Sequence, residues 1–260
     1  MCNFLILTAN LIIKLDKINT LELQLSLLYN LCGTIFGGEN MKKEFIFLGP
    51  PACGKGTQTA KLAQYLNLPH IDTGSLLRYE ISKSTPDGKI AKSYIDKGSL
   101  VPAELVANII KNRLAQKDCD NGYILDGFPR SVEQAEKLEI IRQELNDLNS
   151  SFFAIYFDID TDILMERIVN RRSCPVCGEI YNLAFKPPEK EGICDKCGSK
   201  LTQRKDDTRE VAQTRFDTYN TETAPLTEYY KQKGILKCVD ADGSIDEVWE
   251  RLLKIIRKAD

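Results

Sequence analysis

A glycine-framed loop with a single lysine, GPPACGKGT at residues 49–57, has the composition of a phosphate-binding site. Small residues let backbone N–H groups converge on phosphate oxygens, and a helix that begins at the loop adds the partial positive charge of its dipole. Lys55 would then bridge the outer phosphates. Ser or Thr usually follows this lysine directly, whereas here Gly56 intervenes and Thr57 comes one place late. An ordinary strand-to-helix turn is the alternative interpretation.

Two C-x₂-C pairs, separated by sixteen residues, are formed by Cys174, Cys177, Cys194 and Cys197. The spacing is typical of a closed Cys₄ zinc site, and Gly178 and Gly198 follow the pairs where tight turns are needed. Four thiolates leave no open coordination position, so a structural zinc ion is predicted, with two disulfides as the alternative. The remaining cysteines have no partner at metal spacing: Cys2, Cys32, Cys53, Cys119 and Cys238.

The elements around the loop follow the order that a phosphate site requires. The apolar run 44–49 predicts a strand before the loop, and apolar residues at helical spacing predict a helix after it. Two further apolar runs, 122–127 and 152–159, are typical of parallel strands covered on both faces. Helical patterns lie between them, around 103–116 and 131–146. We therefore predict an α/β fold with a doubly wound parallel sheet.

Two segments interrupt this alternation. Residues 72–101 contain helical stretches and no predicted strand, which indicates a helical insert. Residues 171–207 hold the cysteine pairs together with prolines and glycines, which indicates a small metal-bound module. The chain then returns to an amphipathic helix at 246–258, and Trp249 is expected to pack with its apolar face.

The overall charge is nearly balanced. The chain has 35 Lys and Arg against 37 Asp and Glu, and 43% of its 260 residues are hydrophobic. This predicts a globular protein without the basic field that would recruit nucleic acid or an acidic membrane. No stretch reaches the roughly 18 to 20 apolar residues that span a bilayer. Cysteines at metal spacing are typical of a reducing compartment, so we expect the cytoplasm.

The first forty residues form a separate segment. The stretch FLILTANLII resembles a short signal core, but no basic segment precedes it and no obvious cleavage site follows. A strand is predicted directly after Met41. We therefore expect residues 1–40 to be an extension of unknown role, with Met41 as the functional start, and an accessory hairpin or helix as the alternative.

Several motifs occur in the order and approximate spacing found in adenylate kinases: GPPACGKGTQ, IDTGSLLR (71–78), YILDGFPRSVEQA (123–135), RIVNRR (167–172) and QRKDD (203–207). The resemblance covers residues 41–260 and is closest to the long-lid, zinc-containing bacterial type. It implies the P-loop nucleoside monophosphate kinase fold, a monomer, ATP, AMP and ADP as ligands, and Mg²⁺ bound with ATP. In that family Gly and then Thr after the lysine are normal.

The resemblance also implies a division of the chain. Core segments would lie at 41–71, 102–170 and 208–260. The insert at 72–101 would bind the nucleoside monophosphate, and the segment 171–207 would be a zinc-binding lid.

The implied reaction is reversible transfer of the γ-phosphoryl group of ATP to AMP, giving two ADP. Such transfer requires two polyanions brought in line and their charge offset, which favours arginines from several segments. Motif positions place on the ATP side Ala52, Cys53, Gly54, Lys55, Gly56, Thr57, Arg171, Ile180, Tyr181 and Gly243. They place on the AMP side Thr73, Arg78, Ser99, Leu100, Val101, Gly127, Phe128, Pro129, Arg130, Gln134, Arg204 and Arg215. They assign catalytic roles to Lys55, Arg130, Arg167, Arg171, Arg204 and Arg215.

Individual roles follow from the same resemblance. Arg130 would clamp the AMP phosphate, and Gln134 would read the adenine edge. Asp206 and Asp207 would orient the arginines of the lid and its hinges. His70, at an expected strand end, is expected to be structural or on the surface, since this chemistry needs no imidazole.

The sequence departs from the family pattern at two positions. Ala52 stands where glycine is usual, and a positive φ there would cost on the order of 1 kcal/mol. Ser75 stands where Asp is common, which leaves Asp126 as the main candidate to hold water around Mg²⁺. Two alternative functions remain open: a kinase for another nucleoside monophosphate, and a nucleotide-gated zinc-ribbon binding protein.

Overall fold

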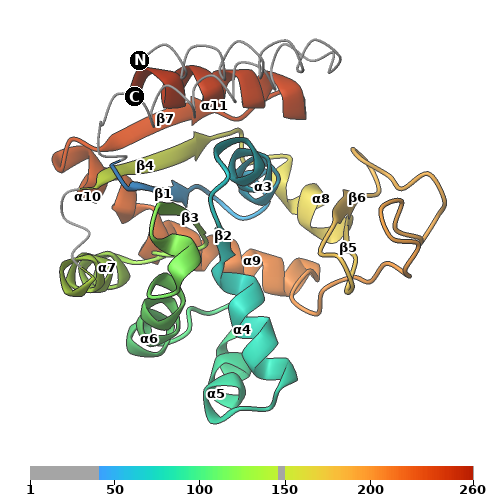
Figure 1. Ribbon diagram of the computed structural model, residues 1–260. Helices are drawn as coiled ribbons and strands as arrows, with labels where there is room; N and C mark the ends of the chain where they lie inside the picture. The colour runs from blue at the N-terminus through green and yellow to red at the C-terminus, as the bar shows by residue number, and fades with distance from the viewer. Residues whose placement is uncertain (1–40, 146–149, 260) are drawn as a thin grey trace, which may run out of the picture. The chain divides into compact units, whose positions relative to one another are not determined.

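A five-stranded parallel sheet is the centre of the computed structural model, which describes residues 41–145 and 150–259 (Figure 1). The strand order is β2-β3-β1-β4-β7, and every neighbouring pair is parallel. The strands are β1 (Lys43–Leu48), β2 (His70–Asp72), β3 (Gly122–Asp126), β4 (Ser151–Asp158) and β7 (Leu236–Asp240). The three central strands match the predicted apolar runs, whereas the edge strand β7 was not predicted. Strand β2 includes Asp72, so the range predicted to lack strands differs from the structure by one residue.

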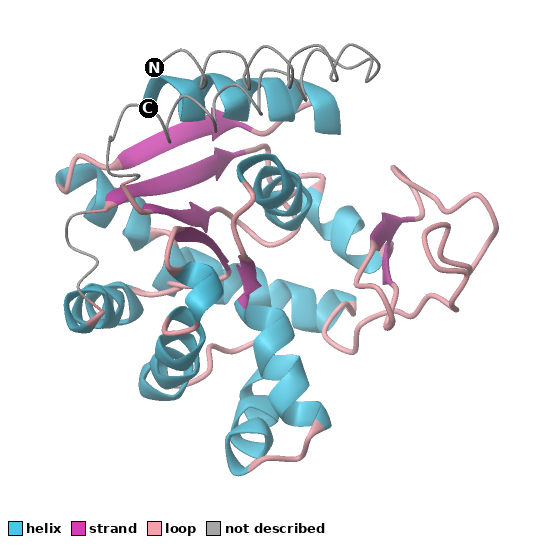
Figure 2. Ribbon diagram, in the orientation of Figure 1, coloured by secondary structure: helices cyan, strands magenta, loops and turns pink. Residues whose placement is uncertain are grey.

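Helices cover both faces of the sheet because the side chains of each strand alternate between them. Phe45 and Phe47 of β1 pack on one face with α3 (Lys55–Leu66), α8 (Leu164–Val169) and α11 (Ile245–Ala259). Ile46 and Leu48 point to the other face, which is covered as shown in Figure 2 by α6 (Ala103–Leu114), α7 (Val132–Glu144) and α10 (Pro225–Gln232). The predicted doubly wound sheet is confirmed, as is the packing of Trp249 in the core.

The predicted helical insert consists of two helices, α4 (Thr73–Ser82) and α5 (Pro86–Ile95). Both begin at a side-chain cap, because the Asp72 carboxylate accepts from Gly74 N and Ser75 N, and Thr85 accepts from Gly88 N. The insert therefore starts directly at the carboxyl end of β2, where ligands bind in open parallel sheets.

The predicted lid contains a small antiparallel hairpin of β5 (Arg171–Ser173) and β6 (Ile180–Asn182). Its buried apolar side chains form a cluster of their own, made of Cys174, Tyr181, Cys194 and Leu201. The chain leaves the lid through α9 (Arg209–Thr218) and a π-helical turn η3 (Tyr219–Thr223). A short 3₁₀ turn η1 (Lys117–Cys119) precedes β3.

Within the described ranges, none of the helices combines the length and apolar character needed to cross a membrane. The extension predicted for residues 1–40 lies outside the described residues.

Candidate functional site

A cleft of about 1670 Å³ opens beside the glycine-rich loop. It brings together residues from the loop, the insert, the segment after β3, the lid and α9. Of the residues predicted for the nucleotide sites, all line this cleft except Phe128, which is fully buried in the core on the α6 and α7 face. The side chain of Phe128 therefore supports the segment that carries Pro129 and Arg130.

The loop between β1 and α3 has the geometry of an anion cradle. Gly54 caps α3 with φ of 95°, so the first N–H groups of the helix face the cleft without a side-chain partner at the cap. Lys55 Nζ lies over the loop and donates to the carbonyls of Gly49 at 2.6 Å and Pro50 at 2.9 Å. The predicted order of strand, loop and helix is thus confirmed, and it positions one ammonium group beside a row of N–H donors.

Ala52 adopts φ of 62°, in the left-handed region. A Cβ in this region crowds the following carbonyl oxygen and costs about 1–2 kcal/mol. The loop therefore carries the strain that was expected if position 52 required a positive φ.

Asp126, at the end of β3, lies close to the loop and 91% buried. Its carboxylate lies 3.3 Å from Thr59 Oγ1, within hydrogen-bond distance, and 3.6 Å from His70 Nε2. Burial by itself would raise the pKa of Asp126, but the hydrogen bond with His70 and the charge of Lys55 hold the pKa below its usual value. Asp126 is therefore an ionised carboxylate at neutral pH, located where a cation bound with a nucleotide would need one.

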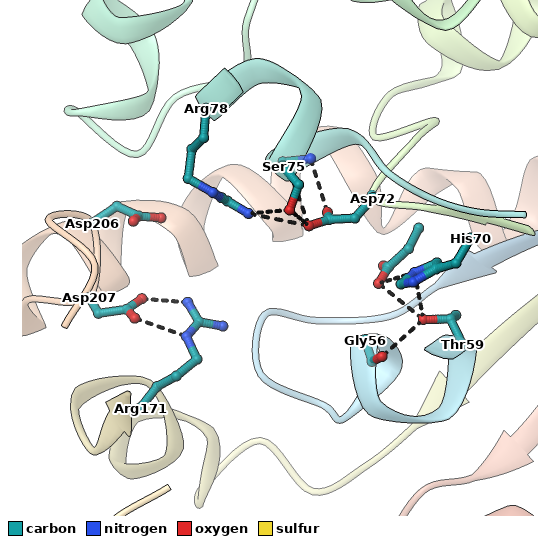
Figure 3. A network of polar contacts seen from close by, with 12 residues as sticks. Gly56, Thr59, His70, Asp72, Ser75, Arg78, Arg171, Asp206 and Asp207 are labelled. Atoms are coloured by element: carbon teal, nitrogen blue, oxygen red, sulfur yellow. Dashed lines mark hydrogen bonds and ion pairs between the residues drawn. The ribbon is translucent and has the colours of Figure 1, made fainter. Parts of the chain in front are cut away.

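The histidine itself is half-buried. His70 Nε2 lies 3.0 Å from Thr59 Oγ1, which is also within hydrogen-bond distance of the backbone carbonyls of Lys55 and Gly56 (Figure 3). His70 thus connects β2 to the first turn of α3, in agreement with a structural position.

Arg78 of α4 is held by two neighbours that lie N-terminal to it. Its Nη2 atom donates to Asp72 Oδ2 at 3.2 Å and to Ser75 Oγ at 3.1 Å, and Ser75 Oγ in turn donates to Asp72 (Figure 3). Asp72 was not singled out from the sequence. An aspartate directly before a helix is a common N-cap signal, and this signal could have identified it.

Gly127 allows Arg130 to fold back onto the end of β3. Arg130 Nε donates to Gly127 O at 2.9 Å, and a Cβ at Gly127 would lie 2.9 Å from Arg130 Nη2. The backbone N–H of Arg130 donates to Gln134 Oε1 at 2.8 Å. This bond fixes the orientation of the buried Gln134 amide. Because Oε1 is occupied, the Nε2 group is the part of the amide that can donate to a ligand.

A carboxylate bridges two arginines at the base of the lid. Arg171 donates through Nε to Asp207 Oδ2 at 2.8 Å and through Nη2 to Asp207 Oδ1 (Figure 3). Arg215 Nη1 lies 3.2 Å from the same Asp207 carboxylate and 3.1 Å from Asp206 Oδ2. Asp207 is fully buried, so these contacts support the predicted orienting role of the two aspartates.

The arginines repel one another in the cleft. Burial, followed by the charges of Arg171 and Arg78, lowers the pKa of Arg204 to about 10. Burial and the charge of Arg171 likewise lower the pKa of Arg215 to about 10. Both side chains remain protonated at neutral pH, and an anion bound among them would relieve their repulsion. The positive charges of the cleft therefore favour the binding of a polyanion.

Two more predicted residues, Arg167 and Gly243, line the cleft. The guanidinium carbon of Arg167 lies 5.6 Å from the centre of the Phe185 ring, and Phe185 also lines the cleft. Gly243, with φ of 120°, follows β7 and precedes α11. Phe185 is a lid residue that the sequence analysis did not select, since an exposed aromatic side chain in a loop carries no spacing signal.

The four lid cysteines converge on one point. Their Sγ atoms all lie within 4.8 Å of one another, with separations of 3.4 Å for Cys174 and Cys197 and 3.5 Å for Cys177 and Cys194. Zinc–sulfur bonds of about 2.3 Å in a tetrahedron require sulfur separations of about 3.8 Å, whereas a disulfide requires about 2.0 Å. The four residues thus fit a tetrahedral metal ion, and all described cysteines are free thiols.

Each cysteine pair lies in a tight turn. Gly178 N donates to Cys174 O at 3.0 Å, and Gly198 N donates to Cys194 O at 2.8 Å. Both glycines have positive φ, of 76° and 72°, which confirms the predicted need for glycine after each pair.

Comparison with known proteins identifies relatives along most of the chain. Residues 47–235 match the family model described as adenylate kinase. The adenylate kinase of Thermodesulfovibrio yellowstonii is 46% identical over 216 residues, which cover 82% of this chain and 98% of the relative. The adenylate kinase of Clostridium perfringens strain 13 is 45% identical over 216 residues (83% and 98%), and that of Clostridium tetani is 46% identical over 211 residues (81% and 97%).

Proposed function

The chain belongs to the adenylate kinase family, and from this premise we propose which of its residues carry out the reaction. The enzyme transfers the γ-phosphoryl group of ATP to AMP reversibly, giving two ADP. One observation supports the assignment of the site most strongly. A phosphate loop and arginines from the core, the insert and the lid line a single cleft. A cleft of this kind can hold two polyanions at once.

The ATP phosphates bind to the loop at the N-terminus of α3. The N–H groups of Gly54 to Thr57 donate to phosphate oxygens, and the Lys55 ammonium exchanges its carbonyl partners for the phosphates. Arg171, Ile180 and Tyr181 of the lid hairpin and Gly243 complete this side.

The AMP site is formed by the insert and by the segment after β3. Arg78 and Arg130 bind the AMP phosphate, with Arg78 held in place by Asp72 and Ser75. The Gln134 amide, whose Oε1 is taken by Arg130 N, presents Nε2 to a ring nitrogen of adenine. Thr73 and residues 99–101 contact the nucleoside.

Transfer itself requires charge compensation more than covalent chemistry. Arg167, Arg171, Arg204 and Arg215 surround the transferring phosphoryl group when the lid segment 171–207 and the insert 72–101 move over the core. Asp207 fixes the directions of Arg171 and Arg215, so the positive groups are arranged before the substrate arrives. Such preorganisation lowers the barrier because no reorientation is needed in the transition state.

Two metal ions belong to the proposed enzyme, one bound with ATP and one in the lid. Mg²⁺ bound with ATP offsets phosphate charge, and the ionised Asp126 would hold its water shell. Zn²⁺ would be held by Cys174, Cys177, Cys194 and Cys197, whose sulfur separations fit a tetrahedral ion. It supplies cross-linking to the lid and leaves no coordination position for substrate.

The oligomeric state and the cellular location of the protein follow from its family and its thiols. We infer a monomer, as the resemblance to the family implies, and a cytoplasmic location, because thiols at metal spacing are typical of a reducing compartment. Light scattering of the purified chain tests the monomer, and a mass of two chains would contradict it.

Replacement of Lys55 tests the site assignment. Lys55→Met is expected to lower kcat by several orders of magnitude with the fold retained, because this charge matters most where negative charge redistributes. Arg130→Ala is expected chiefly to raise KM for AMP. Circular dichroism controls for folding. A folded Lys55→Met protein with near-normal turnover would refute the assignment.

The choice of monophosphate is tested separately. ADP formation from ATP is measured with AMP, GMP, CMP and UMP in turn, in the wild type and in Gln134→Ala. We expect the wild type to use AMP much faster than the other monophosphates. In Gln134→Ala the ratio of the rate with AMP to the rates with the others should fall. Equal use of GMP by the wild type would favour the alternative of a different monophosphate kinase.

A further inference from the structure

Tyr181 is the central residue of β6 and its side chain is 97% buried. It packs with Cys174, Cys194 and Leu201 in the small cluster of the lid and with neither face of the central sheet. A tyrosine in such a place contributes its ring to packing, and its hydroxyl needs hydrogen-bond partners within the lid.

The Tyr181 hydroxyl has two partners, both on the second cysteine pair. Its oxygen accepts from Asp195 N at 2.9 Å, and it lies 3.5 Å from Cys194 Sγ. A metal-bound cysteine is a thiolate without a proton, and the hydroxyl oxygen already accepts from Asp195. The only arrangement that satisfies all three groups is donation from the tyrosine O–H to Cys194 Sγ.

The register of the hairpin directs the Tyr181 ring to another face than the Arg171 side chain. In the β5–β6 register Tyr181 lies opposite Arg172, whereas Arg171 lies opposite Asn182. Side chains of successive strand residues point to opposite faces, so Ile180 and Arg171 share the face opposite to the Tyr181 ring. The strand thus turns the Tyr181 ring toward the cysteines, while both Ile180 and Tyr181 belong to the lining of the cleft.

We propose that Tyr181 is a positioning residue of the metal site, whose hydroxyl holds the Cys194 thiolate and couples the metal to the strand that lines the ATP side. The inference rests on the proposed zinc site. A hydrogen bond to a ligating thiolate fixes the direction of the sulfur lone pairs, and losing such a partner typically weakens metal binding 10- to 100-fold. The same hydroxyl accepts from Asp195 N, which anchors the backbone at Asp195 and through it the turn that carries Cys197.

Tyr181→Phe tests the hydroxyl, since it keeps the ring and its packing. Zinc affinity of the full chain is measured by competition with a chromogenic chelator, and is expected to fall at least 10-fold. In the cobalt-loaded protein, the thiolate-to-cobalt absorption bands are expected to shift, because the charge on one sulfur changes. KM for ATP should rise, whereas KM for AMP should stay near the wild-type value.

Two further variants serve as comparisons. Tyr79→Phe removes a hydroxyl from an exposed side chain on α4 and should leave zinc affinity unchanged. Tyr181→Leu removes the ring as well and measures the contribution of packing. If Tyr181→Phe binds zinc within twofold of the wild type with an unchanged cobalt spectrum, and only Tyr181→Leu loses metal, the inference is overturned. If the wild type holds no stoichiometric metal, the proposed zinc site itself fails.

Discussion

At the scale of single residues, one position in the cleft has a backbone conformation that a residue with a Cβ atom disfavours. Ala52 has φ of 62° in the phosphate loop, a conformation that favours glycine. The loop keeps this conformation because its ends are fixed by β1 and by α3. The strain lowers the free energy of unfolding, but it does not change the direction of the N–H groups of the loop.

Ala52→Gly is expected to stabilise the protein. Relief of about 1–2 kcal/mol of left-handed strain exceeds the roughly 0.4–1 kcal/mol lost through the freer unfolded chain. The net gain of about 0.5–1 kcal/mol is expected to raise Tm by about 1–4 °C, measured by calorimetry. Ala60→Gly, the same change inside α3, should instead lower Tm. A lower Tm in both variants would contradict the role assigned to the backbone at position 52.

Asp207 is the second decisive single residue, because it pairs with Arg171 and Arg215 while fully buried. Asp207→Asn removes the charge that both guanidinium groups share. We expect a loss of about 3–5 kcal/mol of unfolding free energy and at least a 10-fold drop in kcat. Urea denaturation and steady-state kinetics measure the two effects. Asp217→Asn, an exposed change on α9, should leave both unchanged, and an equal effect of the two substitutions would argue against the bridging role.

At the scale of elements, the lid is a small module that buries few apolar side chains. Its hairpin strands have three residues each, and its buried cluster is built largely from the cysteines themselves. Such a module cannot bury enough surface to fold independently, so the proposed zinc ion would supply much of its stability.

Removal of the metal is therefore expected to loosen residues 171–207 first. Chelation should make the lid susceptible to limited proteolysis and lower Tm while the far-ultraviolet dichroism of the core persists, and Cys194→Ser should act in the same way. Exchange of zinc for cobalt or cadmium should leave kcat nearly unchanged, because the ion supplies only geometry. A large change in kcat after exchange, with the lid still folded, would indicate a catalytic metal instead.

At the scale of the whole molecule, distant segments meet in the cleft. Thr223 Oγ1 donates to Arg130 O at 2.6 Å across 93 residues, and Thr218 Oγ1 donates to Gly98 O at 3.3 Å across 120 residues. Residues 42–260 form one compact unit. Activity thus depends on the folding of this entire unit.

A protein that begins at Met41 is expected to retain the wild-type kcat and KM values. The relatives match over 98% of their own length while covering about 82% of this chain, so their activity does not require a counterpart of the remainder. Removal of α11 at the other end serves as the control, because it takes Val248, Leu252 and Ile256 from the core and should prevent folding. Loss of activity on deletion of residues 1–40 would show that they contribute to the fold.

The sequence by itself determined the features that depend on local pattern. The phosphate loop, the cysteine ligands and the three central strands follow from residue types at fixed spacing, because a turn, a knuckle or a buried strand is specified by a few adjacent residues. Motif positions also located the arginines of the cleft.

Only the tertiary structure decided how these residues act on one another. That Asp207 serves two arginines, that Asp72 holds Arg78 and that the Tyr181 hydroxyl meets Cys194 depends on contacts between separate segments. The lowered pKa values of Arg204 and Arg215 likewise arise from burial and from charges brought in by other segments. Edge strand β7 was missed because a short strand with exposed positions is stabilised by its neighbour β4 more than by its own sequence.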